Sequence, residues 1–519
     1  MPDILDKIIE RRREDLDRLG PAFGMPVPAV RERSVVPFLQ ERGAILEIKR
    51  ASPSRGDIVP DLDVPSLCRR YRSAGASAVS VLTEPHFFKG SLMDLLGATR
   101  SDSGSDRPLA FLRKDFLLRE EEIEVSYRCG ADAVLLIARI LDLDRLMAMA
   151  AKANELGLRA LVEVRTGKDA EKLLTVSRRY PVLAGVNARD LATFTIDLLI
   201  PAAMIRSMPV PAVYESGIQS PTLARYAGEL GFQGILVGEE AARNPDDAGV
   251  LVSAFLGAEA DQIGRFWQSL AERREMRRAS QDRAKPETAP SVRPLVKICG
   301  LTRTEDALFA AELGADLLGF VFAESKRTAN AGLVRDVRGT LSNMVNLRRP
   351  LLVGVITELS SSLATEAVEL CREGILDVLQ WHGDPLTESP LLRDLPHYRV
   401  VRVGVPEDFA MVQDLRGVGS VRFLLDTKVE GLAGGTGTRI PSELLEGLLK
   451  EVPDLRSRGL WLAGGLGPDT VGAVLARYRP ELVDASSRLE AEPGKKDRAK
   501  LEAFFKAIES IQGGLFHDQ

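Results

Sequence analysis

The feature that most constrains this chain is a regular alternation of short apolar runs with longer helix-like segments. Each run is rich in β-branched residues, and a polar loop and a segment of helical periodicity follow it. In the first half the runs are AILEIK (44–49), ASAVSVLT (76–83), PLAFLRK (108–114), DAVLLIA (132–138), LRALVEV (158–164), VLAGVN (182–187), PAVYES (211–216) and QGILVG (233–238). Eight such units favour a closed parallel barrel over an open doubly wound sheet.

The same alternation begins again after residue 294. The second set of runs is LVKIC (295–299), ADLLGFVF (315–322), PLLVGVI (350–356), ILDVLQW (375–381), YRVVRVG (398–404), VRFLLD (421–426), LWLAGG (460–465) and ELVDAS (481–486). A chain of 519 residues is long enough for two barrels of about 250 residues each.

We therefore predict an α/β fold of two tandem (βα)8 TIM barrels. The first barrel spans residues 1–257 and includes an extra N-terminal helix. A linker at 258–293 consists of a charged helix and a Pro-rich stretch, and the second barrel spans 294–519. The alternative is a pair of flavodoxin-like domains, which would need fewer strands in each half.

Composition excludes several classes of function. The formal net charge is −5 with both signs interspersed, so no basic block predicts nucleic-acid binding. No apolar run approaches the length needed to cross a bilayer, and the N-terminus is a charged amphipathic helix, unlike a signal peptide. Four cysteines without metal-like or paired spacing indicate a reducing compartment, so we expect a cytoplasmic protein.

Polar residues recur where the strands of the first half end. Glu47 and Lys49 share one face of their strand, while Leu46 and Ile48 point the other way, toward the helices. Active sites of such barrels lie at the C-terminal ends of the strands, so several polar residues there predict one convergent site. The other polar strand-end residues are Lys114, Glu163, Asn187, Arg189, Glu215 and Ser216.

Seven motifs of the first half, in order, resemble indole-3-glycerol phosphate synthase. They are EIKRASPSRGDI, SVLTEPHFFKGS, LRKDF, ALVEV, GVNARDL, ESGI and ILVGE. That family closes the indole ring of 1-(2-carboxyphenylamino)-1-deoxyribulose 5-phosphate with loss of carbon dioxide and water. The resemblance implies that Lys114 is the general acid, that Glu163 accepts a proton in the dehydration, and that Glu47 and Lys49 orient the site and relay protons.

The resemblance also implies how this substrate is held. Asn187 and Arg189 would bind the anthranilate part, against an apolar wall of Phe116 and Leu82. Two residues depart from the family pattern, namely Glu240 and Tyr214. The phosphate and the remaining polar contacts are expected on Ser52, Glu215, Ser216, Gly217, Gly238 and Glu239.

In the second half a cysteine ends one strand and an aspartate ends another. Cys299 closes VKIC and Asp426 closes FLLD, so a thiolate and a carboxyl group would face one cavity. The other cysteines, Cys68, Cys129 and Cys371, are expected to be inert core residues. The motifs VKICGLTR, GFVF, SKR, LQWHG, LLDT, GGTG, LAGGLGPDTV and DASSRLEAEPGKKD resemble phosphoribosylanthranilate isomerase.

That family performs an Amadori rearrangement of N-(5-phosphoribosyl)anthranilate, which yields the substrate of the first barrel. By resemblance Asp426 would protonate the furanose oxygen, Cys299 would remove the C2 proton, and Arg327 would pair with the anthranilate carboxylate. For His382 both a structural and a catalytic role stay open. Trp381 and Lys326 depart from the family pattern. The phosphate is expected on Gly435, Gly464, Gly465, Ser486 and Ser487.

The sequence thus predicts a bifunctional enzyme of tryptophan biosynthesis, a carboxy-lyase joined to an isomerase. Neither resemblance implies a metal, nucleotide or redox cofactor. The expected partners are small phosphorylated derivatives of anthranilate; we expect a monomer, with other enzymes of the pathway as candidate protein partners. Two alternatives stay open, namely that one barrel is inactive and kept as a structural partner, or that the chain is a non-catalytic sensor of phosphate ligands.

Overall fold

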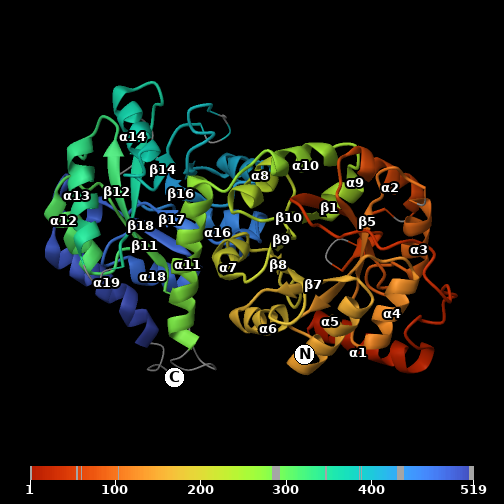
Figure 1. The fold of residues 1–519 in the computed structure, drawn as a ribbon. Coiled ribbons are helices and arrows are strands. Elements are labelled where there is room, and N and C mark those ends of the chain that lie inside the picture. The colour runs from red at the N-terminus through yellow and green to blue at the C-terminus, as the bar shows by residue number, and fades with distance from the viewer. Residues whose placement is uncertain are drawn as a thin grey trace. The chain divides into compact units, whose positions relative to one another are not determined.

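The computed structural model describes residues 3–53, 56–59, 61–102, 104–282, 293–344, 348–384, 386, 389–428 and 438–513. The chain divides into two compact units, Met1–Ala260 and Asp261–Gln519 (Figure 1). Within the described residues, every helix is too short or too polar to cross a membrane.

The strands of the first unit close into a barrel. They pair in parallel in the order of the chain, and β1 closes the ring by pairing with β10 on one side and β4 on the other. The barrel predicted for the first half is therefore confirmed. Its strands are β1 (Gly43–Ile48), β4 (Ala78–Leu82), β5 (Ala110–Lys114), β6 (Ala133–Ile137), β7 (Arg159–Val164), β8 (Val182–Asn187), β9 (Ala212–Glu215) and β10 (Gly234–Val237).

Helices surround this barrel, and β2 (Ala51–Ser52) and β3 (Gly56–Asp57) form a small hairpin after β1. Several helices begin at a residue whose side-chain oxygen accepts a backbone N–H of the first turn, such as Ser91, Asp142 and Thr166. The helices are α1 (Ile4–Leu19), α2 (Val64–Ser73), α3 (Leu92–Ser101), α4 (Glu120–Arg128), α5 (Leu143–Glu155), α6 (Gly167–Ser177), α7 (Leu199–Met204), α8 (Pro221–Glu229), α9 (Glu239–Arg243) and α10 (Ala248–Leu256), with a 3-10 turn at Ile205–Ser207.

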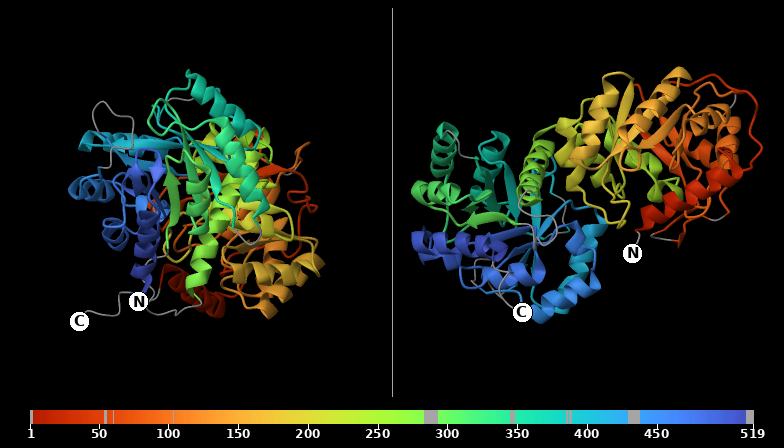
Figure 2. Two further views of the ribbon diagram at one scale, coloured as in Figure 1. Left: turned by 90° about the vertical axis from the view of Figure 1, so that its left-hand side faces the viewer. Right: turned by 90° about the horizontal axis from the view of Figure 1, so that it is seen from below.

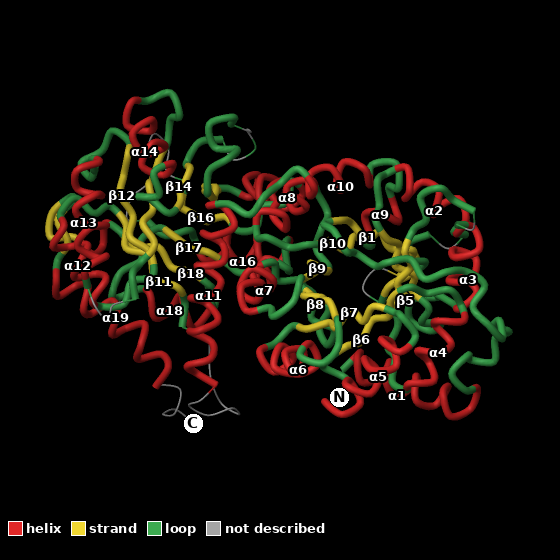
Figure 3. The backbone as a smooth tube through the Cα atoms, in the orientation of Figure 1, coloured by secondary structure: helices red, strands yellow, loops and turns green. Residues whose placement is uncertain are grey.

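The second unit is also a closed parallel barrel, so the flavodoxin-like alternative is wrong. Figure 3 shows in each unit the ring of strands inside its helices. The strands are β11 (Leu295–Cys299), β12 (Leu317–Phe322), β13 (Leu351–Ile356), β14 (Val378–Trp381), β15 (His397–Val403), β16 (Phe423–Thr427), β17 (Trp461–Ala463) and β18 (Leu482–Ala485). The hairpin β19 (Glu490–Glu492) and β20 (Lys495–Lys496) follows. The helices are α11 (Gln262–Asp282), α12 (Thr304–Glu312), α13 (Ala331–Asn343), α14 (Ser362–Arg372), α15 (Phe409–Gly417), α16 (Ser442–Glu451), α17 (Leu455–Arg458), α18 (Val471–Tyr478) and α19 (Arg498–Gly513), with 3-10 turns at Pro406–Asp408 and Ser487–Leu489.

Helix α11 lies in the region that the sequence assigned to a linker, and in the structure it is part of the second unit (Figures 1 and 2). Arg274 pairs with Glu481 at 2.9 Å, and Arg277 pairs with Asp316 at 2.8 Å. Both acidic residues directly precede a strand, β18 and β12 respectively. The helix therefore contacts the end of the barrel at which the strands begin, opposite the expected site.

Candidate active sites

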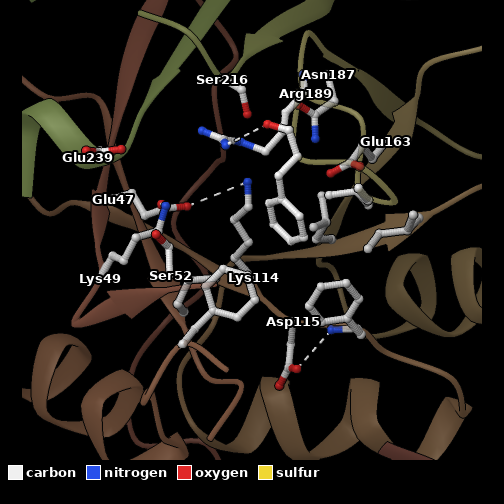
Figure 4. A pocket seen from close by; sticks show the side chains of 17 residues that line it. Glu47, Lys49, Ser52, Lys114, Asp115, Glu163, Asn187, Arg189, Ser216 and Glu239 are labelled. Atoms are coloured by element: carbon white, nitrogen blue, oxygen red, sulfur yellow. Dashed lines mark hydrogen bonds and ion pairs between the residues drawn. The ribbon is translucent and has the colours of Figure 1, made fainter. Parts of the chain in front are cut away.

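A pocket of about 640 Å³, its open mouth included, lies at the C-terminal ends of the first unit's strands. Lys114 lies near its centre, with Glu47, Lys49 and Ser52 on one side and Glu163, Asn187 and Arg189 on the other (Figure 4). The convergence expected from the sequence is thus present in the structure. The lining residues are Glu47, Lys49, Ser52, Leu82, Phe88, Lys114, Asp115, Phe116, Leu135, Ile137, Glu163, Asn187, Arg189, Leu191, Phe194, Ser216 and Glu239.

Lys114 is surrounded by carboxylates. Its Nζ donates to Oε2 of Glu215 at 3.0 Å and lies 3.6 Å from Oε2 of Glu47. Burial disfavours the ammonium, but the negative charges of Glu215, Glu47 and Glu163 outweigh this effect and raise the pKa of Lys114. The side chain is therefore positively charged at neutral pH.

Glu47 and Lys49 form an ion pair on the wall of the pocket. Oε1 of Glu47 lies 2.5 Å from Nζ of Lys49. Burial opposes ionisation of Glu47, yet Lys49 and Lys114 together hold the pKa of that carboxyl below its usual value. Gly238, which precedes α9, makes room for this pair, because a Cβ there would lie 2.6 Å from Oε1 of Glu47.

Glu163 behaves differently from Glu47, although both line the same pocket. Burial, with the nearby negative charge of Glu215, raises the pKa of Glu163 to about 7, while Lys114 and a hydrogen bond with Asn187 partly offset this rise. Near neutral pH this carboxyl group can therefore either hold or release a proton, as a catalytic acid–base requires.

Glu215 lies behind Lys114 and is fully buried, so its side chain takes no part in the wall of the pocket. Its Oε1 occupies the space above Gly185 of β8, where a Cβ would come within 2.0 Å of that oxygen. The structure therefore places Glu215 as a partner of Lys114, whereas the sequence grouped it with the substrate-binding residues.

Backbone and hydroxyl groups at one edge of the pocket suit an anion. Ser52 is buried, and its Oγ has no hydrogen-bond partner among the described residues. Ser216 and Gly217 both have left-handed backbones, with φ of 68° and 87°, in the tight turn after β9. A non-glycine residue in this conformation is strained, and such strain is concentrated at binding sites. Gly238 and Glu239 lie at the start of α9.

The two departures in this half point away from the pocket. Glu240 accepts a hydrogen bond at 2.6 Å from the side chain of Asn244 in the same helical segment. Tyr214 is fully buried and packs edge-on against Tyr226 and Phe232 on the helical side of β9. Neither side chain lines the pocket.

In the second unit Cys299 ends strand β11 and Asp426 is the next-to-last residue of β16, and both are buried. Burial raises the pKa of Asp426 to about 6, although a hydrogen bond from the backbone N–H of Thr427 at 2.8 Å lowers it in part. Burial also raises the pKa of the Cys299 thiol, and the ammonium of Lys297 offsets part of this rise. Asp426 can thus donate a proton near neutral pH, whereas Cys299 can act as a base only in its thiolate form, which Lys297 favours.

Arg327, expected to bind the anthranilate carboxylate, pairs with a carboxylate of the protein. Its Nε and Nη2 donate to the two oxygens of Glu490, each at 2.9 Å. Nζ of Lys496 donates to Oε1 of the same carboxylate at 3.1 Å. A substrate carboxylate at Arg327 would therefore exchange with Glu490 or share the guanidinium with it.

The expected phosphate residues of this unit lie close to Cys299 and Asp426. A Cβ on Gly464, whose φ is 88°, would lie 3.0 Å from Oδ1 of Asp426. The hydroxyl of Ser486 donates to the backbone carbonyl of Cys299 at 3.0 Å. Gly465 has a φ of 57°, and Ser487 begins a 3-10 turn. Gly435 lies outside the described residues.

Three further residues of this half have defined surroundings. His382 is buried, and its Nε2 lies 2.8 Å from Nε2 of Gln380. The indole N–H of Trp381 donates to the carbonyl of Thr357 at 3.2 Å, and its ring packs in the core. Lys326 is exposed. In the part of the chain that is described, no group of three or more His, Cys, Asp or Glu residues could hold a metal ion.

Comparison with known proteins gives the same division of the chain. A model of the indole-3-glycerol phosphate synthase family matches residues 5–251, and a model of the N-(5'-phosphoribosyl)anthranilate isomerase family matches residues 296–507. A multifunctional tryptophan biosynthesis protein from Phanerodontia chrysosporium is 31% identical over 588 residues, which cover 98% of this chain and 70% of that protein. The chain belongs to the family of multifunctional tryptophan biosynthesis proteins.

Two further relatives agree with this assignment. A multifunctional tryptophan biosynthesis protein from Schizosaccharomyces pombe is 30% identical, over 91% of this chain and 60% of that protein. The chain thus spans 60% to 70% of the length of these multifunctional relatives. An indole-3-glycerol phosphate synthase from Geobacillus thermodenitrificans is 36% identical over 249 residues, which cover 47% of this chain and 93% of that protein. The first unit is the synthase domain and the second is the isomerase domain.

Sequence reasoning missed several residues of the synthase pocket. Asp115 follows Lys114 and pairs with Arg12 of α1 at 2.9 Å. It stands in the LRKDF motif, so the motif itself could have identified it. The other missed residues are apolar and come from strand β6 or from loops, where no pattern distinguishes a pocket wall from core: Phe88, Leu135, Ile137, Leu191 and Phe194. In the isomerase domain, Lys297 and Glu490 were missed.

Proposed function

We propose that the chain catalyses two consecutive steps of tryptophan biosynthesis. The isomerase domain converts N-(5-phosphoribosyl)anthranilate to 1-(2-carboxyphenylamino)-1-deoxyribulose 5-phosphate. The synthase domain then converts this product to indole-3-glycerol phosphate, with loss of carbon dioxide and water. One observation carries the proposal for ring closure: Lys114, held charged by carboxylates, faces Glu163, whose pKa is raised to about 7.

In the synthase domain, the charged Lys114 polarises the substrate carbonyl and delivers the proton that its oxygen takes up. Glu163 in its ionised form accepts a proton in the later dehydration. Glu47 and Lys49 keep Lys114 oriented and relay protons. Asn187 and Arg189 hold the anthranilate group against Phe116 and Leu82, and the phosphate binds at the edge formed by Ser52, Ser216 and the start of α9.

In the isomerase domain, Asp426 in its protonated form donates a proton to the furanose oxygen, and the ring opens to a Schiff base. Cys299 as the thiolate removes the proton at C2. The raised pKa of Asp426, about 6, supports the role of acid, because a measurable fraction stays protonated near neutral pH. Gly464, Gly465, Ser486 and Ser487 bind the phosphate through backbone and hydroxyl donors.

We further propose a cytoplasmic, monomeric protein whose partners are the phosphorylated substrates, with other enzymes of the pathway as candidate protein partners. All four cysteines are unpaired, which supports a reducing compartment. Their positions separate the proposed base from the others: Cys299 ends strand β11, whereas Cys68 and Cys371 lie in helices and Cys129 directly follows one.

The direct test supplies each substrate separately to the purified chain. We expect loss of phosphoribosylanthranilate in the first assay, and indole fluorescence with release of carbon dioxide in the second. Turnover of only one substrate would instead indicate a barrel kept as a structural partner. Binding of both without turnover would indicate a sensor of phosphate ligands, and either result would contradict the proposal.

A further inference from the structure

A fully buried lysine, Lys297, stands beside the proposed base of the isomerase domain and has no assigned role. It lies two residues before Cys299 on β11, so the two side chains project from the same face of the strand. The neighbouring strand β12 has a glycine opposite them. A Cβ on Gly319 would lie 2.7 Å from Sγ of Cys299 and 3.0 Å from Nζ of Lys297, so both atoms share the space above this residue.

The lysine is held in this place from the other side. Its Nζ donates at 2.6 Å to Oδ2 of Asp484, which lies on the adjacent strand β18. The other oxygen of Asp484, Oδ1, has no hydrogen-bond partner within the described parts of the chain. Burying an ammonium and a carboxylate is costly, because both ions lose their hydration. The pair of Lys297 and Asp484 nevertheless lies next to Cys299. It places the positive charge of Lys297 where the thiolate of Cys299 would form.

Other charged or titratable groups also face the thiol, from four elements or loops. Lys496 of β20 and Arg327, which follows β12, are cationic, but both are held by the carboxylate of Glu490. Tyr398 of β15 donates its hydroxyl hydrogen to Gln380 at 2.7 Å. Asp426 lies near the C-terminal end of β16, on the same rim. Of the two charged groups that act most strongly on the thiol, Asp484 opposes the thiolate and Lys297 favours it.

We propose that Lys297 is a positioning residue of the isomerase reaction: its ammonium, aligned by Asp484, stabilises Cys299 as the thiolate that acts on C2. This inference rests on the proposed role of Cys299. In the step it serves, the C2–H bond of the protonated Schiff base breaks and the proton goes to Sγ. The electron pair of that bond forms the C1–C2 double bond, and the iminium electron pair returns to nitrogen. Lys297 forms no bond to substrate.

The test measures the reactivity of the Cys299 thiol as a function of pH in the full chain. Alkylation by iodoacetamide is followed at Cys299 by mass spectrometry in the wild type and in Lys297→Met, Lys297→Arg and Asp484→Asn. Lys297→Met should move the midpoint of the alkylation profile to higher pH and lower the rate at pH 8 about tenfold. Asp484→Asn should move the midpoint to lower pH, and Lys297→Arg should stay closer to the wild type than Lys297→Met.

The opposite signs separate an electrostatic role from a structural one. A substitution that merely loosens the barrel would expose the thiol and raise the alkylation rate in both the Lys297→Met and the Asp484→Asn variants. Shifts of the same sign, or no shift in any variant, would overturn the inference. If Lys297→Met does not fold, Lys297→Arg and Asp484→Asn still decide between these results. Isomerase kcat should fall at least tenfold in Lys297→Met and recover in part as pH rises, while KM changes less than kcat.

Failure of the proposed function would give a different result. If Cys299→Ala retained isomerase activity, the thiol would not be the base, whatever the alkylation profiles of the other variants. If Cys299→Ala lost activity while the alkylation profiles did not shift, the function would stand and the role of Lys297 would be wrong. Ring-closure activity in the same chain serves as the internal control, since no substitution lies in the synthase domain.

Discussion

Single residues set the geometry of the synthase pocket, and Gly238 is the clearest case. Its φ is −100°, so space and not backbone strain is what excludes a side chain there. In Gly238→Ala the new Cβ would displace the Glu47 carboxylate from Lys49 and Lys114. We expect kcat/KM for ring closure to fall by about ten- to a hundredfold, because small misplacements of catalytic groups are costly. Steady-state assays of both reactions measure this.

The matched control is Gly167→Ala in the same unit. Gly167 begins α6, and a Cβ there would have no atom within 4 Å. It should leave ring closure unchanged, and isomerase activity should be unchanged in both variants. Equal effects of Gly167→Ala and Gly238→Ala on ring closure would show that Gly238 has no special role.

The raised pKa of Glu163 predicts how the stability of the first unit depends on pH. Its pKa is about 7 in the folded chain against about 4.5 for an unperturbed glutamate, so the folded state binds the proton more tightly. This contribution to stability is fully present below pH 4.5 and is lost as pH rises through 7. At pH 8 the ionised group therefore costs about 1 to 3 kcal/mol, and Glu163→Gln should relieve that cost.

We expect Glu163→Gln to raise the melting temperature of the first unit by about 3 °C or more at pH 8. At pH 4.5 the two proteins should melt together, since both side chains are then neutral. Scanning calorimetry at the two pH values, with ring closure assayed in parallel, provides the measurement. A variant less stable than the wild type at pH 8 would mean that contacts of the carboxylate with Lys114 outweigh its burial.

Strand alternation and position at the rim predict which side chains can converge, and they predicted Glu47, Lys49, Lys114 and Glu163 in one pocket. The same alternation places Lys297 on the same face as Cys299, but a single lysine inside an apolar strand does not by itself indicate a site. Phe88 comes from a loop, where no periodicity shows which side chain turns inward. The pairing of Lys114 with Glu215 could not be predicted either, because it depends on how side chains pack across the barrel.

At the scale of elements, the strands were predictable and α11 was not. The apolar runs coincide with strands because parallel strands covered by helices are buried on both faces. In α11 the arginines suggest a solvated linker helix, since a charge is rarely buried without a partner. The partners, Asp316 and Glu481, lie about 40 and 200 residues away along the chain, and only the fold brings them close.

Helix α11 should therefore be required for the stability of the second barrel. A fragment of residues 261–519 should be folded and retain isomerase activity, whereas residues 294–519 should be destabilised by about 3 kcal/mol or more. The physical reason is the loss of Trp267, whose ring centroid lies 6.4 Å from that of Trp461, and of both arginine pairs. Denaturant unfolding of the two fragments tests this, with Trp267→Ala in the full chain as a second measure. Equal stability of the two fragments would show that α11 only links the two units and does not stabilise the second barrel.

At the scale of the whole molecule, the chain consists of two barrels, each of which carries at one end the acid–base groups proposed for one reaction. Lys114 and Glu163 belong to the first unit, and Cys299 and Asp426 belong to the second. Every group proposed to act in a given reaction comes from a single unit. The two reactions should therefore be separable by substitution, which is the central claim of this account.

The most direct test assays both reactions in Lys114→Ala and Cys299→Ala. Lys114→Ala should lower ring closure about a thousandfold and leave isomerisation within twofold of the wild type, because a general acid or base typically contributes a factor of about 10² to 10⁴. Cys299→Ala should do the reverse. Loss of both activities from either single substitution would contradict two independent sites in one chain.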